Sequence, residues 1–187
     1  MLEHTPPHGE RPAPASAPIL RIGHGYDLHR LEPRGSGGPV RPLVIGGIAF
    51  EHDHGPVGHS DADALLHAVT DALLGALALP DIGQMFPDSD PDNEGRPSAD
   101  FLSQALQLVR EHGYRIVNLD ATVILERPRL GPRKLEVRQN IARLLELPVE
   151  RINVKGKTHE RVDAVGQGRA IEAHAVVLLA YAGEGVG

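Results

Sequence analysis

The sequence predicts a single α+β domain in which helices cover one face of a mostly four-stranded mixed sheet, with a small hairpin beside it. Three observations indicate this fold class. Several segments alternate apolar and polar residues with the period of a strand, and the segments between them carry apolar residues at helical spacing. The resulting order is strand, hairpin, helix, helix, strand, helix, strand, strand. The length of 187 residues suits one domain with one core.

The domain is expected to span residues 18–183, between an N-terminal tail over 1–17 and a C-terminal tail over 184–187. The N-terminal segment is rich in Pro, Ala and His and has no apolar periodicity. Because such a composition cannot bury enough apolar surface to order the chain, we expect this tail to be disordered.

The first strand begins at Ile19. Its alternation places Asp27 and His29 on one face and His24 on the other, where a structural role is expected for the latter. The pair Gly46-Gly47 between two short apolar runs predicts a tight hairpin. A polar, His-rich loop is expected to follow.

The segment HSDADALLHAVTDALLG, residues 59–75, predicts a helix that continues to about Ala78 and ends before Pro80. Ser60 is the expected N-cap, and Asp63 at the third helical position completes a capping pattern. Its carboxylate is also favourably placed near the positive end of the helix dipole.

The remaining elements follow from periodicity and from the glycines and prolines that separate them. A second helix is expected from Ser98 to a C′ residue at Gly113, and a third opens at 131–132. Strands are expected over 114–125, 151–157 and 170–181. The side chains predicted to face inward are Val117, Leu119, Ala121, Val123 and Leu125 in the first of these strands, and Leu135, Ile141, Leu144 and Leu145 in the third helix.

Asp63, His67 and Asp71 recur at one-turn intervals on the side of the first helix that lies opposite its core face. A solvated face would explain such a stripe. Leu74 and Leu77 occupy the polar side too, however, so the helix is apolar nearly all round, and we expect a subunit or the wall of a cleft to cover it. Enclosed charges need partners, because an unpaired buried charge costs several kcal/mol, and a divalent metal is one such partner.

Asp27, His29 and His67 form a plausible three-ligand metal site that leaves a fourth position open, as in catalytic zinc sites. The two aspartates of the helix stripe are then expected to orient the site or to serve the structure. His59 is excluded as a further ligand. It precedes His67 by eight residues, about 12 Å along a helix at 1.5 Å per residue, whereas ligands of one tetrahedral zinc lie ~3.4 Å apart given ~2.1 Å bonds.

Composition restricts the function classes. The absence of Cys excludes disulfide scaffolds and finger-type zinc sites, so that a transition metal must be held by carboxylates and by some of the 11 His. The formal charge of −6 argues against general nucleic-acid binding, which needs a basic face. No apolar run approaches the ~20 residues of a membrane span, and the N-terminus does not read as a signal peptide. A soluble, cytoplasmic protein without nucleic-acid or membrane partners is expected.

Three segments resemble one known family. These are GHGYDLHR at 23–30, GHSDADALLHAVTDALLGALALPDIGQMFPDSDP at 58–91 and VKGKTHE at 154–160. Together they are similar to the 2-C-methyl-D-erythritol 2,4-cyclodiphosphate synthases of the non-mevalonate isoprenoid pathway, and the resemblance covers about residues 20–182. It implies a homotrimer with active sites between subunits. It also implies metal-assisted intramolecular phosphoryl transfer in a cytidine diphosphate substrate, with release of CMP.

The resemblance also implies roles for residues of this sequence. Zinc would be held by Asp27, His29 and His67, and Mg²⁺ or Mn²⁺ would bridge the substrate diphosphate with Glu160 as its direct protein ligand. His59 and Thr158 would stabilise the transition state. The residues expected to bind substrate are Asp27, Leu28, His29, His59, Ser60, Asp81, Ile82, Gly83, Phe86, Pro87, Asp88, Ser89, Asp90, Leu125, Pro128, Arg129, Leu130, Gly131, Lys157, Thr158, His159, Glu160, Ala164 and Gln167.

The last motif departs from the family pattern. Lys157, Ala164 and Gln167 stand where many members have Thr, Phe and Arg. The missing Arg removes a cation expected to contact phosphate, and we hypothesise that Lys157 compensates, since either side chain can serve a diphosphate as a cation.

Two other readings of the same residues remain open. A zinc-dependent phosphoester hydrolase would use the open metal position to activate water, although the sequence identifies no dedicated general base beside it. A non-catalytic metal-binding or interaction module would use the polar stripe only for packing between subunits. The set His59, Thr158 and Glu160 favours the synthase over such a module.

Overall fold

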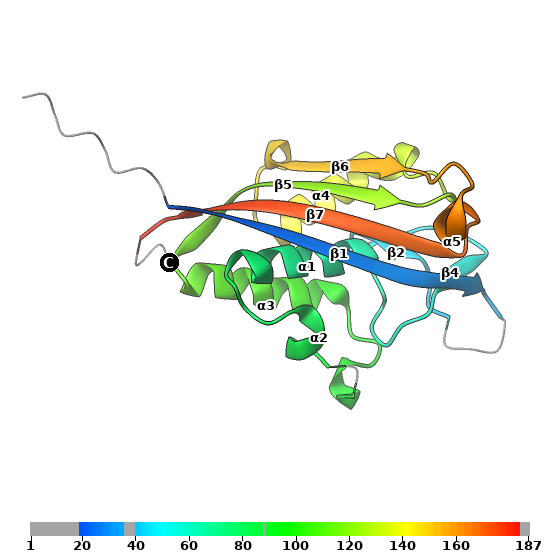
Figure 1. Cartoon of the computed structure of the whole chain (residues 1–187), viewed down its shortest axis with the longest axis horizontal. Helices are drawn as coiled ribbons and strands as arrows, with labels where there is room; N and C mark the ends of the chain where they lie inside the picture. Colours follow the sequence, from blue (N-terminus) through cyan, green and yellow to red (C-terminus); the bar gives the residue numbers. More distant parts are fainter. Residues whose placement is uncertain (1–18, 36–39, 88, 184–187) are drawn as a thin grey trace, which may run out of the picture.

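The computed structural model describes residues 19–35, 40–87 and 89–183, so the expected tails lie outside the described residues. A five-stranded mixed sheet in the order β4-β1-β7-β5-β6 forms the centre of the molecule (Figure 1). Within this sheet, as far as the structure describes it, β5 and β6 form the only parallel pair. The strands of this sheet are β1 (Leu20–Pro33), β4 (His54–Pro56), β5 (Tyr114–Ile124), β6 (Ile152–Lys157) and β7 (Ala170–Tyr181).

The hairpin and the helices complete the fold as an α+β arrangement. The hairpin consists of β2 (Val44–Ile45) and β3 (Ile48–Ala49), and Gly46 and Gly47 at its turn have φ of 61° and 76°, which glycine adopts without steric cost. Among the described residues, no helix is long and apolar enough to cross a membrane. The helices are α1 (Ala64–Ala76), α2 (Ile82–Met85), α3 (Ser98–Glu111), α4 (Lys134–Leu144) and α5 (Asp163–Gly166), with single 3₁₀ turns at Pro91–Asn93, Gly131–Arg133 and Val149–Arg151.

The expectation of four strands in the sheet was wrong, because β4 adds a fifth. This strand lies in the segment expected to be a His-rich loop and pairs with the end of β1, where Leu31 faces Pro56 and Pro33 faces His54. Its three residues, His, Gly and Pro, carry no strand pattern of their own. Pairing with β1 therefore determines their conformation, which local propensity did not indicate.

The first helix begins later than expected, because Asp63 and not Ser60 is its N-cap. Ala62 adopts a left-handed conformation with φ 55°, which prevents the helix from starting at residue 61. The Asp63 carboxylate accepts hydrogen bonds from the N–H groups of Leu65 and Leu66, both at 3.1 Å, and from those of Gly46 and Gly47 at 2.9 and 2.6 Å. Burial raises the pKa of Asp63 to about 6, against the opposing effect of these N–H donors. One buried side chain thus joins the start of α1 to the hairpin.

Helix α1 lies on β1 and β7 and is buried around nearly its whole circumference. The close approach to β1 depends on two glycines. A Cβ atom at Gly23 would lie 1.8 Å from the Ala72 carbonyl oxygen, and one at Gly25 would lie 1.9 Å from that of Ala68. Because neither backbone atom can move independently of the helix, these two positions set the separation of α1 from the sheet.

Two inward-facing side chains were predicted wrongly. In β5 the register shifts between Ile116 and Asn118, so that Ile116 is buried in place of Val117. Such a β-bulge adds one residue to the strand and reverses the faces on one side of it. In α4 Leu135 is 57% exposed, and Val137 takes the inward position. The expected bounds of α3 are confirmed to within two residues, and Gly113 follows it with φ 74°.

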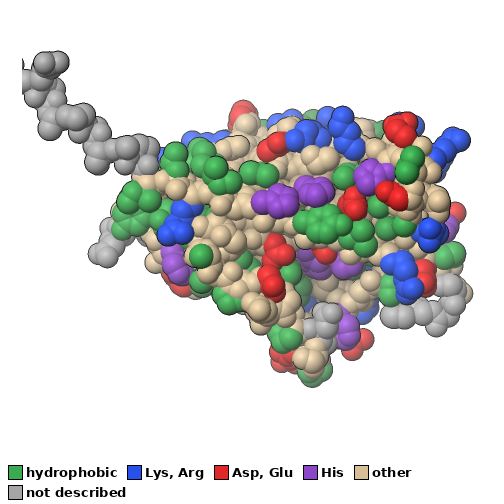
Figure 2. Space-filling view, in the orientation of Figure 1, with side chains coloured by type: hydrophobic (Ala, Val, Ile, Leu, Met, Phe, Trp, Pro, Cys, Tyr) green, Lys and Arg blue, Asp and Glu red, His purple; other side chains and the backbone are tan. Residues whose placement is uncertain are grey.

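The sheet face away from the helices is exposed and unusually apolar (Figure 2). On β1 it carries Ile22, Tyr26 and Leu28, which are 72%, 46% and 44% exposed. Histidine side chains lie among these apolar groups, and His24 Nε2 is 3.3 Å from His174 Nδ1. The apolar side of the β1 pattern thus faces outward, whereas the glycines and Asp27 face α1.

Candidate functional site

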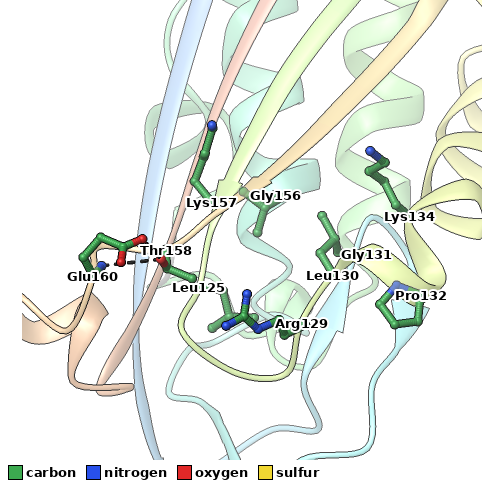
Figure 3. A pocket seen from close by; sticks show the side chains of 11 residues that line it. Leu125, Arg129, Leu130, Gly131, Pro132, Lys134, Gly156, Lys157, Thr158 and Glu160 are labelled. Carbon is green, nitrogen blue, oxygen red and sulfur yellow. Dashed lines mark hydrogen bonds between the residues drawn. The ribbon is translucent and has the colours of Figure 1, made fainter.

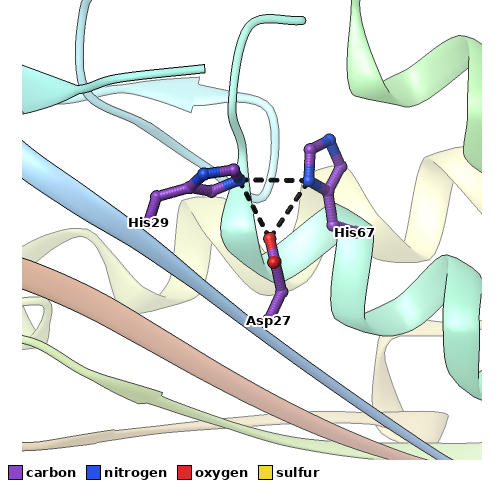
Figure 4. Close-up of side chains that lie close together, drawn as sticks. All are labelled: Asp27, His29 and His67. Carbon is purple, nitrogen blue, oxygen red and sulfur yellow. Dashed lines mark hydrogen bonds and ion pairs between the residues drawn. The ribbon is translucent and has the colours of Figure 1, made fainter. Parts of the chain in front are cut away.

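Asp27, His29 and His67 converge on one point between β1 and α1 (Figure 4). Asp27 and His29 are alternate residues of the strand, and His67 comes from the first turns of the helix that the glycine contacts hold against it. Asp27 Oδ2 lies 3.0 Å from His29 Nε2 and 3.1 Å from His67 Nδ1, and the two nitrogens are 3.2 Å apart. Ligands of a tetrahedral zinc lie ~3.4 Å apart given bonds of ~2.1 Å. Two imidazole nitrogens and one carboxylate oxygen at nearly this spacing can hold a divalent metal.

The charges in this triad are strongly coupled. Burial by itself would raise the pKa of Asp27, but hydrogen bonds and charge interactions with His29 and His67 outweigh it and hold this pKa well below its usual range. Burial would lower the pKa of His67, yet Asp27, with smaller effects of Asp63 and Asp61, raises it. Asp27 is therefore ionised at neutral pH, whereas a metal must displace a proton from His67 over part of the pH range.

The other ring nitrogen of His67 faces a buried hydroxyl that the sequence did not indicate. His67 Nε2 lies 2.8 Å from Ser98 Oγ and 3.2 Å from Ser60 Oγ, and Ser98 is fully buried. The Ser98 hydroxyl donates in turn to an oxygen of Asp61, and the Ser98 N–H donates to its other oxygen at 3.1 Å. With the Nε2 proton donated to Ser98, Nδ1 is left free to face Asp27 and a metal.

A cavity of about 200 Å³ opens beside the triad. Its walls come from the triad, from the predicted loop around α2 and from the start of α3, where the rings of Phe86 and Phe101 stack with centroids 4.6 Å apart. Asn93 helps to fix the loop, since its side-chain amide donates to the Pro87 carbonyl at 3.1 Å. The lining residues are His29, Ser60, His67, Ile82, Gly83, Phe86, Asn93 and Phe101.

A second, larger cavity of about 680 Å³ lies between the ends of β5 and β6 and the start of α4 (Figure 3). Thr158 and Glu160 lie at one side of it, where the Thr158 hydroxyl donates to Glu160 Oε1 at 2.8 Å. Three cationic side chains, Arg129, Lys134 and Lys157, make it suitable for an anionic ligand. The other lining residues are Val123, Leu125, Leu130, Gly131, Pro132 and Gly156.

A model of the YgbB family matches residues 20–180. The chain belongs to the YgbB family. Two relatives show how similar this sequence is to those of known proteins. The chloroplastic 2-C-methyl-D-erythritol 2,4-cyclodiphosphate synthase of Oryza sativa subsp. japonica is 51% identical over 179 residues, which cover 96% of this chain and 78% of the relative. The synthase of the same name from Rhodopirellula baltica is 50% identical over 160 residues, or 86% and 93% of the two chains.

Solved structures of the same family share the fold. A structure described as 2C-methyl-D-erythritol-2,4-cyclodiphosphate synthase superposes with a TM-score of 0.77 at 43% identity, covering 85% of this chain and 99% of that one. A Plasmodium falciparum IspF described as a CDP complex superposes with a TM-score of 0.76 at 34% identity, covering 88% and 97%.

The two acids of the helix stripe, Asp63 and Asp71, have structural roles. Asp63 caps α1, as described above, and Asp71 accepts a hydrogen bond from the Ile82 N–H at 2.8 Å, which anchors α2. Asp61 and Ser98 occupy the orienting position that was expected of these acids. Their contact joins residues 37 apart in sequence, a separation for which single-sequence periodicity gives no signal.

The remaining predicted residues are distributed around the two cavities. His59 is exposed, and its carbonyl accepts from the Gly95 N–H and from Arg41. Asp81 and Asp90 cap α2 and the turn after it, and His159 contacts Asp163 and Glu172. Leu28 lies on the exposed sheet face, and Pro128 lines a neighbouring cavity with Arg129. Ser89 and Gln167 are exposed, and Ala164 is partly buried. Asp88 lies outside the described residues.

Within one chain the predicted site falls into two groups. No residue that lines the triad cavity also lines the larger cavity with Thr158 and Glu160. The two groups therefore line separate cavities of one chain.

Replacing Ser98 with alanine should weaken metal binding roughly 10–100-fold, the usual effect of losing an outer partner of a ligating imidazole. The reason is that His67 loses the acceptor that fixes its ring orientation and tautomer. Zinc dissociation constants measured with a competing chromophoric chelator provide the test. Ser103→Ala, at an exposed position of the same helix, is the matched control. Equal zinc affinities for the two variants would show that Ser98 does not orient His67.

Metal affinity should rise with pH through the titration of His67. Asp27 raises the pKa of His67, so a proton occupies this imidazole more often than an ordinary one at neutral pH and below. Since the protonated nitrogen cannot bind a metal, acidification should release it, and alkalinisation should increase the affinity until His67 is deprotonated. Zinc affinity measured at intervals between about pH 5.5 and 8.5 tests this; a flat profile would contradict it.

Proposed function

We propose that this chain converts 4-diphosphocytidyl-2-C-methyl-D-erythritol 2-phosphate to 2-C-methyl-D-erythritol 2,4-cyclodiphosphate with release of CMP. The observation that carries the proposal is the convergence of Asp27, His29 and His67 beside an open cavity, in a chain 51% identical to a synthase of that name. A phosphorus-oxygen lyase of isoprenoid precursor biosynthesis accounts for the triad and for the cationic cavity together.

The reaction makes one phosphorus-oxygen bond and breaks another. An oxygen of the 2-phosphate attacks the β-phosphorus, and the bond from that phosphorus to the oxygen of the departing CMP breaks, without consumption of water. Two phosphate groups must meet against their mutual repulsion, so the protein has to supply positioning and positive charge. A chain with a formal charge of −6 needs local cations to do so.

Two divalent ions fit the available donors. The two imidazoles and one carboxylate of the triad suit Zn²⁺, and the Glu160 carboxylate suits Mg²⁺ or Mn²⁺. Bound at these places, the ions would supply charge neutralisation and Lewis-acid polarisation of phosphate oxygens. The chain itself fixes the donors, through Ser98 on His67 and through the Thr158 hydroxyl on Glu160.

The other side chains bind and orient the substrate. His59, held through its carbonyl by Arg41 and by the Gly95 N–H, presents its exposed imidazole to phosphate, and His59 and Thr158 stabilise the transition state. The loop of α2 binds the methylerythritol part, and the loop 125–131 binds cytidine. The CDP complex of the Plasmodium falciparum relative supports a nucleotide pocket in this fold.

We further propose that the active unit is a homotrimer, in which the triad of one subunit meets the larger cavity of its neighbour. The sheet face with Ile22, Tyr26 and Leu28 supports this, because several large apolar side chains exposed on one face are typical of a protein–protein contact. Sedimentation velocity of the purified protein tests the proposal. A trimeric mass for the wild type and a smaller one for Ile22→Glu support it, and a wild-type monomer with full activity would refute it.

Phosphorus NMR of the reaction separates the candidate activities. The purified protein is incubated with the cytidine diphosphate substrate, Zn²⁺ and Mg²⁺. Cyclic diphosphate and CMP are the expected products. Ring-free phosphates would instead identify a phosphoester hydrolase, and no turnover by metal-loaded protein of confirmed fold would leave only a metal-binding or interaction module.

Lys157→Ala should raise KM for the substrate about tenfold. Lys157 lines the larger cavity, and a charge-assisted contact to phosphate contributes about 1.5–3 kcal/mol, of which 1.4 kcal/mol corresponds to a factor of ten. Lys155→Ala is the control, because its ammonium pairs with Asp120 and it does not line the cavity. Arg169, whose Nη2 is 2.7 Å from Gln167 Oε1, is a second cation close to the position of the missing Arg. An unchanged KM in Lys157→Ala would exclude compensation by Lys157.

The expected cytoplasmic location stays a prediction. The relatives from Oryza sativa and Arabidopsis thaliana are named as chloroplastic proteins.

A further inference from the structure

We propose that His52, Asp53 and His54 form a second site for a divalent transition-metal ion, separate from the triad of Asp27. The three residues precede and begin β4. They line a cavity of about 510 Å³ whose walls share no residue with either cavity described above. The cavity borders Gln167 and the loop 125–131, to which substrate contacts were assigned above, but the proposal gives the metal ion itself no part in the reaction.

The carboxylate oxygen of Asp53 lies as close to two imidazole nitrogens as that of Asp27 does in the triad. Asp53 Oδ1 lies 3.2 Å from His52 Nδ1 and 2.9 Å from His54 Nδ1. One ligand atom from each of the three residues lies within 4.8 Å of the others, and the two rings have centroids 5.5 Å apart. Two imidazole nitrogens and a carboxylate oxygen form the same donor set as the triad. Such a set favours Zn²⁺, Co²⁺ or Ni²⁺ over Mg²⁺ and Ca²⁺, which prefer oxygen ligands.

The backbone around these residues is fixed by the sheet. His54 pairs with Pro33 across β4 and β1, and the Asp53 carbonyl accepts from the Arg34 N–H at 2.8 Å. The chain bends at Asp53, just before β4, and both imidazoles approach the Oδ1 atom of this residue. His52 is mostly buried, whereas Asp53 is 81% exposed, which leaves an approach from solvent to the shared oxygen.

A partly buried acidic residue, Glu126, also lines this cavity. Glu126 Oε2 is buried and has no hydrogen-bond partner in the described part of the chain. A buried carboxylate oxygen without a partner is unfavourable, and positive charge nearby lowers this cost. Arg127, Arg161 and Arg169 also line the cavity, so guanidinium groups lie around the same acidic residues.

Zinc stoichiometry tests the proposal directly. Metal-free full-length protein is dialysed against excess Zn²⁺ without Mg²⁺, and bound zinc per chain is measured by mass spectrometry. The double variant His52→Ala/His54→Ala should bind one zinc equivalent fewer than the wild type. The single variant His67→Ala should keep the equivalent at the proposed second site, and the triple variant His52→Ala/His54→Ala/His67→Ala should lose that equivalent as well. His112→Ala, which changes an exposed histidine after α3, is the control and should lose none.

If circular dichroism shows that the double variant is unfolded, the conservative variant His54→Gln replaces it in the zinc measurement. Imidazole ¹⁵N NMR of the wild type identifies the ligands. Zn²⁺ should shift the ring-nitrogen resonances of His52 and His54 at saturation. Equal zinc content in wild type and in a folded variant, or unshifted His52 and His54 resonances, would overturn the proposal. Because neither measurement uses substrate, failure here leaves the synthase proposal untouched, and failure of the synthase assay leaves this site untouched.

Discussion

Replacing Gly25 with alanine should lower the free energy of unfolding by about 3 kcal/mol or more and abolish metal binding at the triad. A Cβ atom there would lie 1.9 Å from the Ala68 carbonyl oxygen and 2.7 Å from the Ala72 N–H nitrogen, both in the backbone of α1. Overpacking in a core usually costs about 1–3 kcal/mol when side chains can adjust, and here only displacement of the helix relieves the clash. Since α1 carries His67 and β1 carries Asp27 and His29, the displacement separates the metal ligands.

Gly75→Ala is the matched control for this prediction. Gly75 lies in the same helix, is exposed, and would place its Cβ no closer than 3.8 Å to any neighbour, the His24 carbonyl oxygen. Alanine should therefore stabilise the protein by roughly 0.5–1 kcal/mol, the usual gain in a helix. Urea unfolding followed by circular dichroism measures both variants. If Gly25→Ala is as stable as the wild type, α1 is not held at the separation described here.

His67→Ala should abolish turnover and weaken zinc binding by on the order of 10²-fold or more, more than is usual for losing an outer-sphere partner. His67 is the only triad member on α1, so its loss leaves two donors from a single strand. The fold should persist, because the helix stays buried through its apolar side chains and remains capped by Asp63. Zinc titration, turnover and thermal unfolding of the variant provide the three measurements.

The control for this experiment is His112→Ala, which should retain zinc affinity, turnover and thermal stability. Wild-type turnover by His67→Ala after removal of metal with a chelator would refute the role assigned to the triad. A large loss of thermal stability would instead show that His67 is needed for the core.

The triad could be predicted from sequence because its members lie on regular elements. The two-residue period of a strand places Asp27 beside His29, and the helical period sets His67 on a polar stripe within an apolar helix. The structure brings these three side chains together as expected. Their identity as metal ligands stays a prediction.

The features that sequence missed depend on contacts between distant segments. β4 exists because β1 extends to Pro33 and offers it a partner, and Ser98 meets Asp61 only after α3 packs beside α1. The start of α1 was misplaced because a single left-handed residue, Ala62, delays the helix. Local propensity describes none of these, since each is decided by tertiary packing or by one backbone angle.

Strand β1 serves two surfaces at once. Its outward side chains, Tyr26 and Leu28, belong to the apolar face proposed to bind other subunits, and they flank Asp27, which faces His29 and His67 of the triad. A change in twist or bend of this strand on assembly must alter the spacing of Asp27 and His29 as well. Substitutions on the outer face can thus change the metal affinity through the strand backbone, without altering a ligand. Because both depend on β1, subunit association and metal binding are thermodynamically linked.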